Sequence, residues 1–241
     1  MKAIETIALT KDYGSKRALD SLNLTVADGE LFALLGVNGA GKTTAIKLLS
    51  CLMKPTAGNA TIYGHDIITE PHQARSILAT SPQETAVAPN LTTRENLELM
   101  AGIYGATGIE AMDKATEMIC RFNLTSIEKT KAKRLSGGWQ RRLSIAMALI
   151  SQPKLLFLDE PTLGLDILAR RELWTIIRAL KGKTTIILTT HYLEEAEALS
   201  DRIGILSAGK LTALGTAAEL IAQSGATDFE DAFIKLAGGV I

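Results

Sequence analysis

A glycine-rich segment near the N-terminal end of the chain constrains the fold more than any other feature. Residues 36–43 read Gly-Val-Asn-Gly-Ala-Gly-Lys-Thr, which matches the pattern G-x-x-x-x-G-K-[ST]. The segment follows the apolar run 31–35, typical of a strand buried on both faces, and leads into a helical pattern over 42–52. In this setting the glycines let successive backbone N–H groups turn inward, and the helix N-terminus adds partial positive charge. The segment therefore predicts a polyphosphate site, with Lys42 on the phosphates and Thr43 on a Mg²⁺ ion.

Two carboxylates at the end of a second apolar run extend this prediction. Residues 155–158 read Leu-Leu-Phe-Leu and are followed by Asp159 and Glu160. The carboxyl ends of parallel strands face the ligand crevice of an α/β sheet. We therefore expect Asp159 to hold Mg²⁺ and Glu160 to orient or deprotonate an attacking water molecule.

Strand and helix patterns alternate along the rest of the chain. Hydrophobic periodicity predicts strands over 4–9, 22–26, 61–63 and 184–189, a late hairpin over 203–214, and helices over 93–103, 109–122, 137–150, 168–180 and 193–199. Capping boxes are predicted where a threonine precedes a glutamate by three residues, at Thr92, Thr107 and Thr216. These elements indicate an α/β fold with a mixed, largely parallel sheet at its core, an N-terminal antiparallel β part and a helical subdomain over about 90–150.

The charge balance and the cysteine spacing disfavour a nucleic-acid-binding protein and a cysteine-based metal site. The 241-residue chain carries 26 Lys and Arg against 26 Asp and Glu, which disfavours a nucleic-acid partner. We interpret the basic cluster between Lys131 and Arg142 as a solvated surface or as counter-charge for phosphate. Cys51 and Cys120 have no metal-ligand spacing, and we expect two buried thiols in a reducing compartment.

No apolar run approaches the roughly 20 residues needed to span a bilayer. The N-terminal residues lack the hydrophobic region of a signal peptide. We therefore expect a cytoplasmic protein whose membrane role, if it has one, is exercised through a partner.

The segment Leu135-Ser136-Gly137-Gly138 distinguishes among the proteins that share such a phosphate loop, which include kinases, GTPases, helicases and transport ATPases. It opens a predicted helix 23 residues before Asp159. A serine hydroxyl and glycine amides at a helix N-terminus form a second anion nest. The segment resembles the LSGG signature of ATP-binding-cassette (ABC) ATPases. This resemblance implies that Ser136, Gly137 and Gly138 reach the γ-phosphate of ATP held by the other subunit of a dimer.

Further motifs of that family follow in the expected order. The resemblance implies that Tyr13 stacks on adenine, that Gln83 touches Mg²⁺ and water, and that His191 reaches the γ-phosphate. Asp166 ends a stretch similar to the D-loop, which contacts the opposite subunit. The implied catalytic residues are Glu160, His191 and Gln83, the implied Mg²⁺ ligands are Thr43, Gln83 and Asp159, and the remaining ATP contacts are Gly36, Asn38, Gly39, Gly41, Lys42, Thr43 and Thr44.

The resemblance also implies an organisation and a set of partners. Residues 1–220 correspond to an ABC ATPase domain with a RecA-like core, and residues 221–241 to a C-terminal helical extension. Two such subunits, identical or different, would close head to tail around two ATP molecules and drive an integral membrane permease through the region after Gln83. The protein would lie on the cytoplasmic face of the cell membrane. Trp139 stands where the family commonly has Gln, and Ile167 where many members have Pro.

The second half of the chain indicates a subgroup. Residues 190–197 and the tail 228–236 resemble cassettes of ABC-2-type exporters, which move drugs, antibiotics, lipids, sodium or polysaccharides. The ATPase subunit of an importer shares the catalytic motifs and remains an alternative. A soluble cassette ATPase of translation or DNA repair is a further alternative, although such proteins usually carry tandem cassettes, coiled coils or zinc modules, none of which this sequence indicates. A P-loop kinase would need an acceptor site and a lid, and Ser136-Gly137-Gly138 argues against that class.

Overall fold

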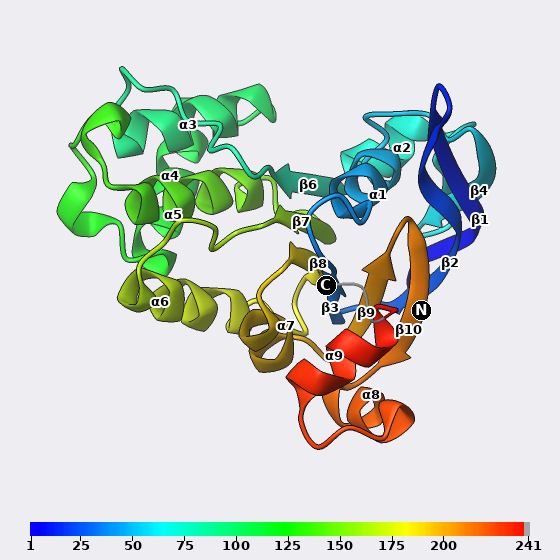
Figure 1. Ribbon diagram of the computed structural model, residues 1–241. Helices are drawn as coiled ribbons and strands as arrows, with labels where there is room; N and C mark the ends of the chain where they lie inside the picture. The colour runs from blue at the N-terminus through cyan, green and yellow to red at the C-terminus, as the bar shows by residue number, and fades with distance from the viewer. Residues whose placement is uncertain (239–241) are drawn as a thin grey trace.

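The computed structural model describes residues 1–238 and is built around a six-stranded mixed sheet (Figure 1). The strand order is β10-β9-β3-β8-β7-β6, in which only β10 runs antiparallel to its neighbour. The apolar runs form the centre of the sheet because both of its faces are covered. The strands are β3 (Leu31–Leu35), β6 (Leu78–Ser81), β7 (Leu155–Asp159), β8 (Thr185–Thr190), β9 (Arg202–Ser207) and β10 (Lys210–Gly215).

A second, antiparallel sheet lies at one side of the molecule, in the order β2-β1-β4-β5. Three of its strands are longer than the sequence predicts: β1 (Lys2–Tyr13), β2 (Lys16–Ala27) and β4 (Ala57–Ile62). The sequence predicts no strand for the two residues of β5 (His65–Asp66). Leu22, Leu24 and Val26 alternate with exposed residues, as predicted, and point into a core shared with α1 (Lys42–Leu49) and α2 (Pro71–Ser76). The antiparallel sheet is thereby fixed against the phosphate loop.

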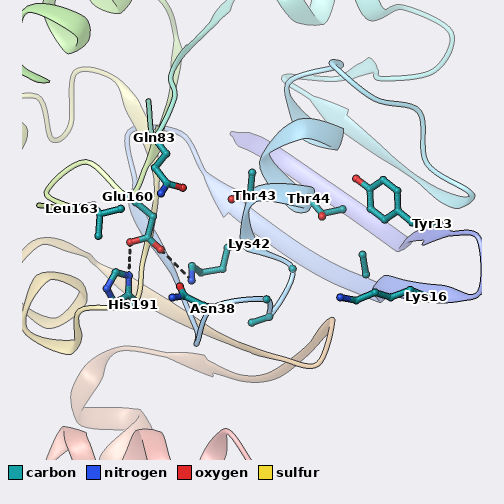
Figure 2. Close-up of a pocket in the computed structure, with 14 residues that line it drawn as sticks. Tyr13, Lys16, Asn38, Lys42, Thr43, Thr44, Gln83, Glu160, Leu163 and His191 are labelled. Atoms are coloured by element: carbon teal, nitrogen blue, oxygen red, sulfur yellow. Dashed lines mark hydrogen bonds and ion pairs between the residues drawn. The ribbon is translucent and has the colours of Figure 1, made fainter. Parts of the chain in front are cut away.

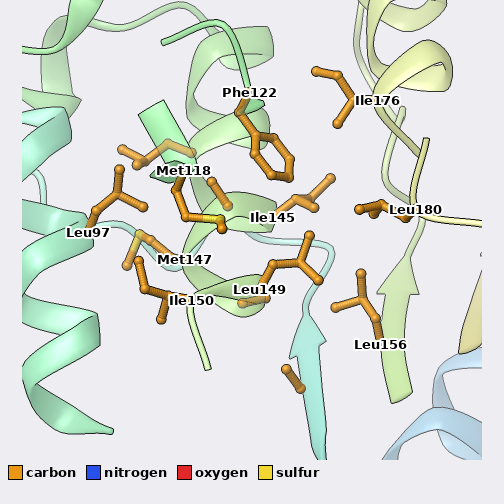
Figure 3. Close-up of a cluster of buried hydrophobic side chains, with 14 of the residues drawn as sticks. Leu97, Met118, Phe122, Ile145, Met147, Leu149, Ile150, Leu156, Ile176 and Leu180 are labelled. Atoms are coloured by element: carbon orange, nitrogen blue, oxygen red, sulfur yellow. The ribbon is translucent and has the colours of Figure 1, made fainter. Parts of the chain in front are cut away.

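The helical region lies on the opposite side from the antiparallel sheet (Figure 1). It contains α3 (Thr93–Ile103), α4 (Gly108–Arg121), the short 3-10 turns η1 (Thr125–Ile127) and η2 (Ala132–Arg134), and α5 (Gly137–Leu149). Figure 3 shows its core, where Leu97, Met118 and Phe122 gather around side chains of α5 such as Met147 and Ile145. Every residue of α5 from Arg141 to Leu149 is buried, because α3, α4, β6 and β7 all pack against this helix.

The last helices are α6 (Ile167–Arg178), α7 (Leu193–Leu199), α8 (Ala217–Ser224) and α9 (Phe229–Leu236). Helices α7, α8 and α9 pack on β3, β9 and β10, whereas α6 packs against α5 and α7. Leu220 and Phe229 pack in one cluster with Leu35 and Ile205, and Phe233 and Leu236 join its edge. The predicted domain boundary at residue 220 falls inside α8 and stays a prediction, and the final three residues of the predicted extension lie outside the described residues.

Two local predictions are wrong. Thr92 and Thr216 form the predicted capping boxes, but the Thr107 hydroxyl makes no capping hydrogen bond. Cys51 is half-buried and Cys120 is exposed, because Cys120 lies off the α4 face that carries Met118 and Ile119 to the core. Within residues 1–238, no helix combines the length and apolarity that a membrane crossing requires.

Candidate functional site

The phosphate loop of residues 36–41 packs so tightly that it admits only glycine at two positions. Gly41 caps α1 in a left-handed conformation, with φ 110°. A Cβ atom at Gly41 would lie 2.5 Å from the Ala18 carbonyl oxygen, and one at Gly36 would lie 2.3 Å from that of Leu206. The strands β2 and β9 thus hold the loop in place while its backbone turns toward the start of α1.

Three charged or titratable side chains meet beside this loop. Lys42 Nζ lies 3.1 Å from Glu160 Oε1, and His191 Nδ1 lies 2.7 Å from Glu160 Oε2 (Figure 2). Lys42 Nζ also donates to the Gly36 carbonyl oxygen at 2.7 Å. The side chains of Lys42 and Glu160 are 5% and 7% exposed, and that of His191 is 28% exposed. A buried ion pair is thus linked to solvent through the imidazole.

The backbone of Glu160 is held in an uncommon conformation. Its φ is 48°, in the left-handed region that side-chain-bearing residues rarely occupy. Its N–H donates to both the carbonyl oxygen and Oγ1 of Thr189, each at 3.1 Å. Such a conformation persists only where neighbouring contacts determine it, and it is concentrated at functional sites. Thr189, at the end of β8, is a supporting residue that the sequence analysis missed.

Asp159 and Thr43 lie side by side beneath the cleft. Thr189 Oγ1 donates to Asp159 Oδ1 at 2.5 Å, and Thr43 Oγ1 lies 3.4 Å from the same oxygen. In the part of the chain that the structure describes, no group of three or more His, Cys, Asp or Glu side chains could hold a metal ion alone. A hydroxyl and a carboxylate fit Mg²⁺, which takes few protein ligands and keeps water and phosphate oxygens.

These residues open onto a cleft of about 630 Å³. Tyr13, 44% exposed, lies at one end, and His191 and Gln83 lie at the other (Figure 2). The predicted residues that line the cleft are Tyr13, Asn38, Gly39, Gly41, Lys42, Thr43, Thr44, Gln83, Glu160 and His191. Gly36 and Asp159 adjoin it through their contacts with Lys42 and Thr43. Four further residues line the cleft that the sequence did not predict: Lys16, Ala18, Ala40 and Leu163.

The remaining predicted residues lie outside this cleft. Ser136 and Gly137 are exposed at the start of α5, and the Ser136 hydroxyl does not cap the helix. Gly138 packs on α6, where an added Cβ would lie 3.2 Å from the Ala169 Cβ. Asp166 is exposed and accepts a hydrogen bond from the Ala169 N–H at 2.9 Å. One chain therefore does not bring the two anion nests together.

Part of the basic cluster is not a solvated surface, so that interpretation is wrong for two of its members. Arg141 and Arg142 are 4% and 6% exposed. Arg142 pairs with Glu172, and its guanidinium lies 4.7 Å from the centroid of the Trp139 ring. Trp139 itself packs against the helical core. Burial lowers the pKa of both arginines.

A buried carboxyl group stands behind the ion pair. Glu195 of α7 is fully buried and accepts a hydrogen bond from Trp174 Nε1 at 3.0 Å. Its second oxygen has no hydrogen-bond partner among the described residues. Burial raises the pKa of Glu195, and the nearby charge of Glu160 acts in the same direction.

Known proteins are similar to this chain in both sequence and fold. A family model described as ABC transporter matches residues 19–163. The chain is 43% identical to the daunorubicin resistance ATP-binding protein DrrA3 of Streptomyces coeruleorubidus, over 98% of this chain and 75% of that protein. It is 41% identical to the probable multidrug ABC transporter ATP-binding protein YbhF of Escherichia coli (strain K12), over 97% of this chain and 41% of that protein.

Two solved structures are similar along most of the chain. The ATP-binding subunit of an ABC transporter has a TM-score of 0.85 and 31% identity, covering 97% of this chain and 99% of its own. A dimeric post-hydrolysis state of the ATP-binding cassette MJ0796, bound to ADP and Pi, has a TM-score of 0.79 and 27% identity, covering 88% and 98%. These similarities confirm the predicted fold class.

Proposed function

The chain belongs to the ABC transporter family of ATP-binding proteins, and on that premise we propose that it hydrolyses ATP to drive an exporter whose permease is a separate membrane chain. One observation carries the proposal: Lys42, Glu160 and His191 form a continuous chain of contacts in one cleft, while Ser136 and Gly137 are exposed outside it. The first arrangement suits hydrolysis, and the second suits a site completed by another subunit.

ATP binding in this cleft requires Lys42 to exchange partners. Its ammonium group is now paired with Glu160, so a phosphate oxygen must replace the carboxylate. Thr43 and Asp159 would hold Mg²⁺, which neutralises charge on the phosphate oxygens. Tyr13, at the far end of the cleft, would stack its ring on the adenine of ATP.

Once Lys42 turns to phosphate, Glu160 is free to act as the general base. His191 Nδ1 holds Oε2 of that carboxylate, so Oε1 is the oxygen that accepts a proton from the attacking water molecule. Gln83, beside Glu160 at the same end of the cleft, orients the same water molecule (Figure 2). The imidazole of His191 thus positions the carboxylate of Glu160 and would also reach the γ-phosphate.

A second subunit, identical or different, would supply the rest of the site. Ser136, Gly137 and Gly138 at the N-terminus of α5 would face the γ-phosphate bound by the partner, with Asp166 near the contact. Closure then buries two ATP molecules head to tail, and hydrolysis reopens the pair. The dimeric form of the similar cassette MJ0796 supports this arrangement.

The exporter assignment draws on the relatives. DrrA3 is named for daunorubicin resistance and YbhF as a multidrug transporter protein, which favours a drug-like cargo and a position on the cytoplasmic face of the membrane. Residues 1–220 would form the ATPase domain, and the residues that follow would form an extension.

Partner capture tests this proposal. The tagged chain is purified from gently solubilised cell membranes, and the tag alone serves as the control. A polytopic membrane protein should co-purify in a fixed ratio, and its sequence would define the cargo class. Recovery of ribosomal or DNA-repair proteins in its place would contradict the exporter assignment and leave the ATPase chemistry standing.

A further inference from the structure

Arg141 on α5 contacts two backbone segments at one end of the cleft, the Gln83 loop and Glu160. Its Nη1 donates to the Pro82 carbonyl oxygen at 2.5 Å, and its Nη2 donates to that of Gln83 at 2.5 Å. Nη2 also lies 3.3 Å from the carbonyl oxygen of Glu160. All three acceptors are backbone carbonyls, and the planar guanidinium fork spans two consecutive ones.

The burial of Arg141 makes these contacts necessary. An arginine side chain stays protonated in proteins, so its charge is present at this nearly inaccessible position. The carbonyl dipoles replace the water that the guanidinium gives up. A shift of any one segment would leave a buried donor unpaired, and this penalty fixes the spacing between α5, the Gln83 loop and Glu160.

Two of the three acceptors belong to residues whose side chains line the cleft, Gln83 and Glu160. Glu160 has a left-handed backbone, and its carbonyl oxygen also accepts from the Leu163 N–H at 3.2 Å. Arg141 therefore contributes to holding Glu160 in the conformation that aims its carboxylate at Lys42 and His191. None of the hydrogen bonds of Arg141 goes to the phosphate loop.

Arg141 also lies about one and a half turns after Ser136, the residue at the start of the same helix. We propose that Arg141 is a positioning residue that ties the signature end of α5 to Gln83 and Glu160. Movement of this end when a partner's nucleotide docks would then be passed to both catalytic side chains. The inference rests on the proposed function and adds a route by which one subunit's signature segment sets the geometry of its own cleft.

The test compares Arg141→Lys with Arg142→Lys in the full-length chain. Both arginines are buried on α5, but Arg142 contacts Glu172 and Trp139 and none of the cleft segments. Lysine keeps the charge and cannot span two carbonyls. We expect Arg141→Lys to lower kcat at least tenfold while the Kd for ATP stays within twofold, and Arg142→Lys to keep kcat within twofold of the parent chain.

A double variant separates positioning from general loosening. The double variant carries both Arg141→Lys and Gln83→Ala. If Arg141 acts through Gln83, the fold-loss of kcat in the double variant relative to the parent chain should be smaller than the product of the two single fold-losses. Arg141→Gln provides a second measurement if the lysine variant folds poorly. Parent-level kcat in Arg141→Lys, a proportional loss of ATP binding, or multiplicative losses in the double variant would overturn the inference.

ATP hydrolysis by the parent chain distinguishes failure of the proposed function from failure of the role proposed for Arg141. If the parent chain binds ATP but shows no hydrolysis above that of Glu160→Gln, the proposed function fails and the inference fails with it. If the parent chain hydrolyses ATP and Arg141→Lys does so equally well, only the role of Arg141 is lost.

Discussion

The cleft around Lys42 and the signature segment at the start of α5 are built in opposite ways. In the cleft, the side chains of Lys42 and Glu160 are nearly buried and pair with each other, and His191 contacts the same carboxylate. Ser136 and Gly137 are exposed, and an added Cβ at Gly137 would meet no atom within 4 Å. The cleft is therefore preorganised by its own chain, whereas the signature segment is open for contact with another molecule. Substitutions in the two regions should fail in different ways.

The largest effect is expected from Glu160→Gln. The amide keeps the size of the side chain but cannot accept the proton, so kcat should fall by about 10²–10⁴-fold, the usual contribution of a general base. ATP binding should persist or tighten, because Lys42 loses its charged partner. Measurement of turnover and of the ATP-dependent dimer by size exclusion tests both points.

Glu194→Gln is the matched control, because Glu194 is exposed on α7 and contacts no cleft residue. It should leave turnover unchanged. Full turnover in Glu160→Gln would show that another group deprotonates the water molecule and would break the comparison at its strongest point.

Lys42→Ala should mainly affect binding. A hydrogen bond to a charged group contributes about 1.5–3 kcal/mol, so removing the ammonium group should weaken ATP binding about 10- to 100-fold. The loss also leaves Glu160 without its cationic partner, which should lower the free energy of unfolding. Titration with a fluorescent ATP analogue measures the first effect, and urea unfolding measures the second.

Lys47→Ala on the exposed side of the same helix should change neither quantity by a comparable amount. Unchanged ATP affinity in Lys42→Ala would count against the assignment of residues 36–43 as the phosphate loop.

Much of the cleft could be predicted because its residues are set by local chemistry. The spacing from Gly36 to Thr43 fixes a loop, and the apolar strands on either side fix its setting, so Lys42, Thr43, Asp159 and Glu160 were found from short segments. Asp159, the last residue of β7, pairs with Thr189, the residue before the end of β8. This pairing could have been inferred for Thr189 only if the strand order had been known.

The missed features depend on contacts between distant segments. Arg141 looks like a surface cation in a basic stretch, and only the packing of α5 against β6 and β7 buries it. The strand β6 is four residues long and has no alternating pattern, so the sequence does not predict it. Its pairing with β7 makes it a strand in the structure. Cys120 shows the converse, an apolar residue type that the geometry of α4 leaves exposed.

Ser136→Arg sharpens the comparison at its other end. The substitution places a bulky cation at an exposed position without a hydrogen bond, so the free energy of unfolding should change by no more than about 0.5 kcal/mol. The ATP affinity of the isolated subunit should stay within about twofold of the parent value, because Ser136 lies outside the cleft. Turnover should fall by about tenfold or more, since the arginine blocks a partner's phosphate.

Ser126→Arg, on an exposed turn of the helical region, controls for the added charge and should leave turnover intact. Loss of ATP binding by the isolated Ser136→Arg subunit would mean that the two regions already cooperate within one chain.

The smallest expected effect concerns Glu195, the buried carboxyl group behind the cleft. Its ionisation in the folded chain should lower the free energy of unfolding. Because burial raises the pKa of Glu195, the folded chain keeps a proton that the unfolded chain releases above its own pKa of about 4.3. Stability is therefore highest below that unfolded pKa and declines as the pH rises toward the folded pKa, by about 1.4 kcal/mol for each unit that separates the two values. Glu195→Gln cannot ionise, so its free energy of unfolding should rise relative to that of the parent chain between pH 5 and pH 8. Urea unfolding at the two pH values, with the exposed Glu197→Gln as control, measures this difference. Equal pH dependence in the parent chain and Glu195→Gln would mean that Glu195 is ionised in the folded state as readily as in water, and that the cleft is preorganised without this penalty.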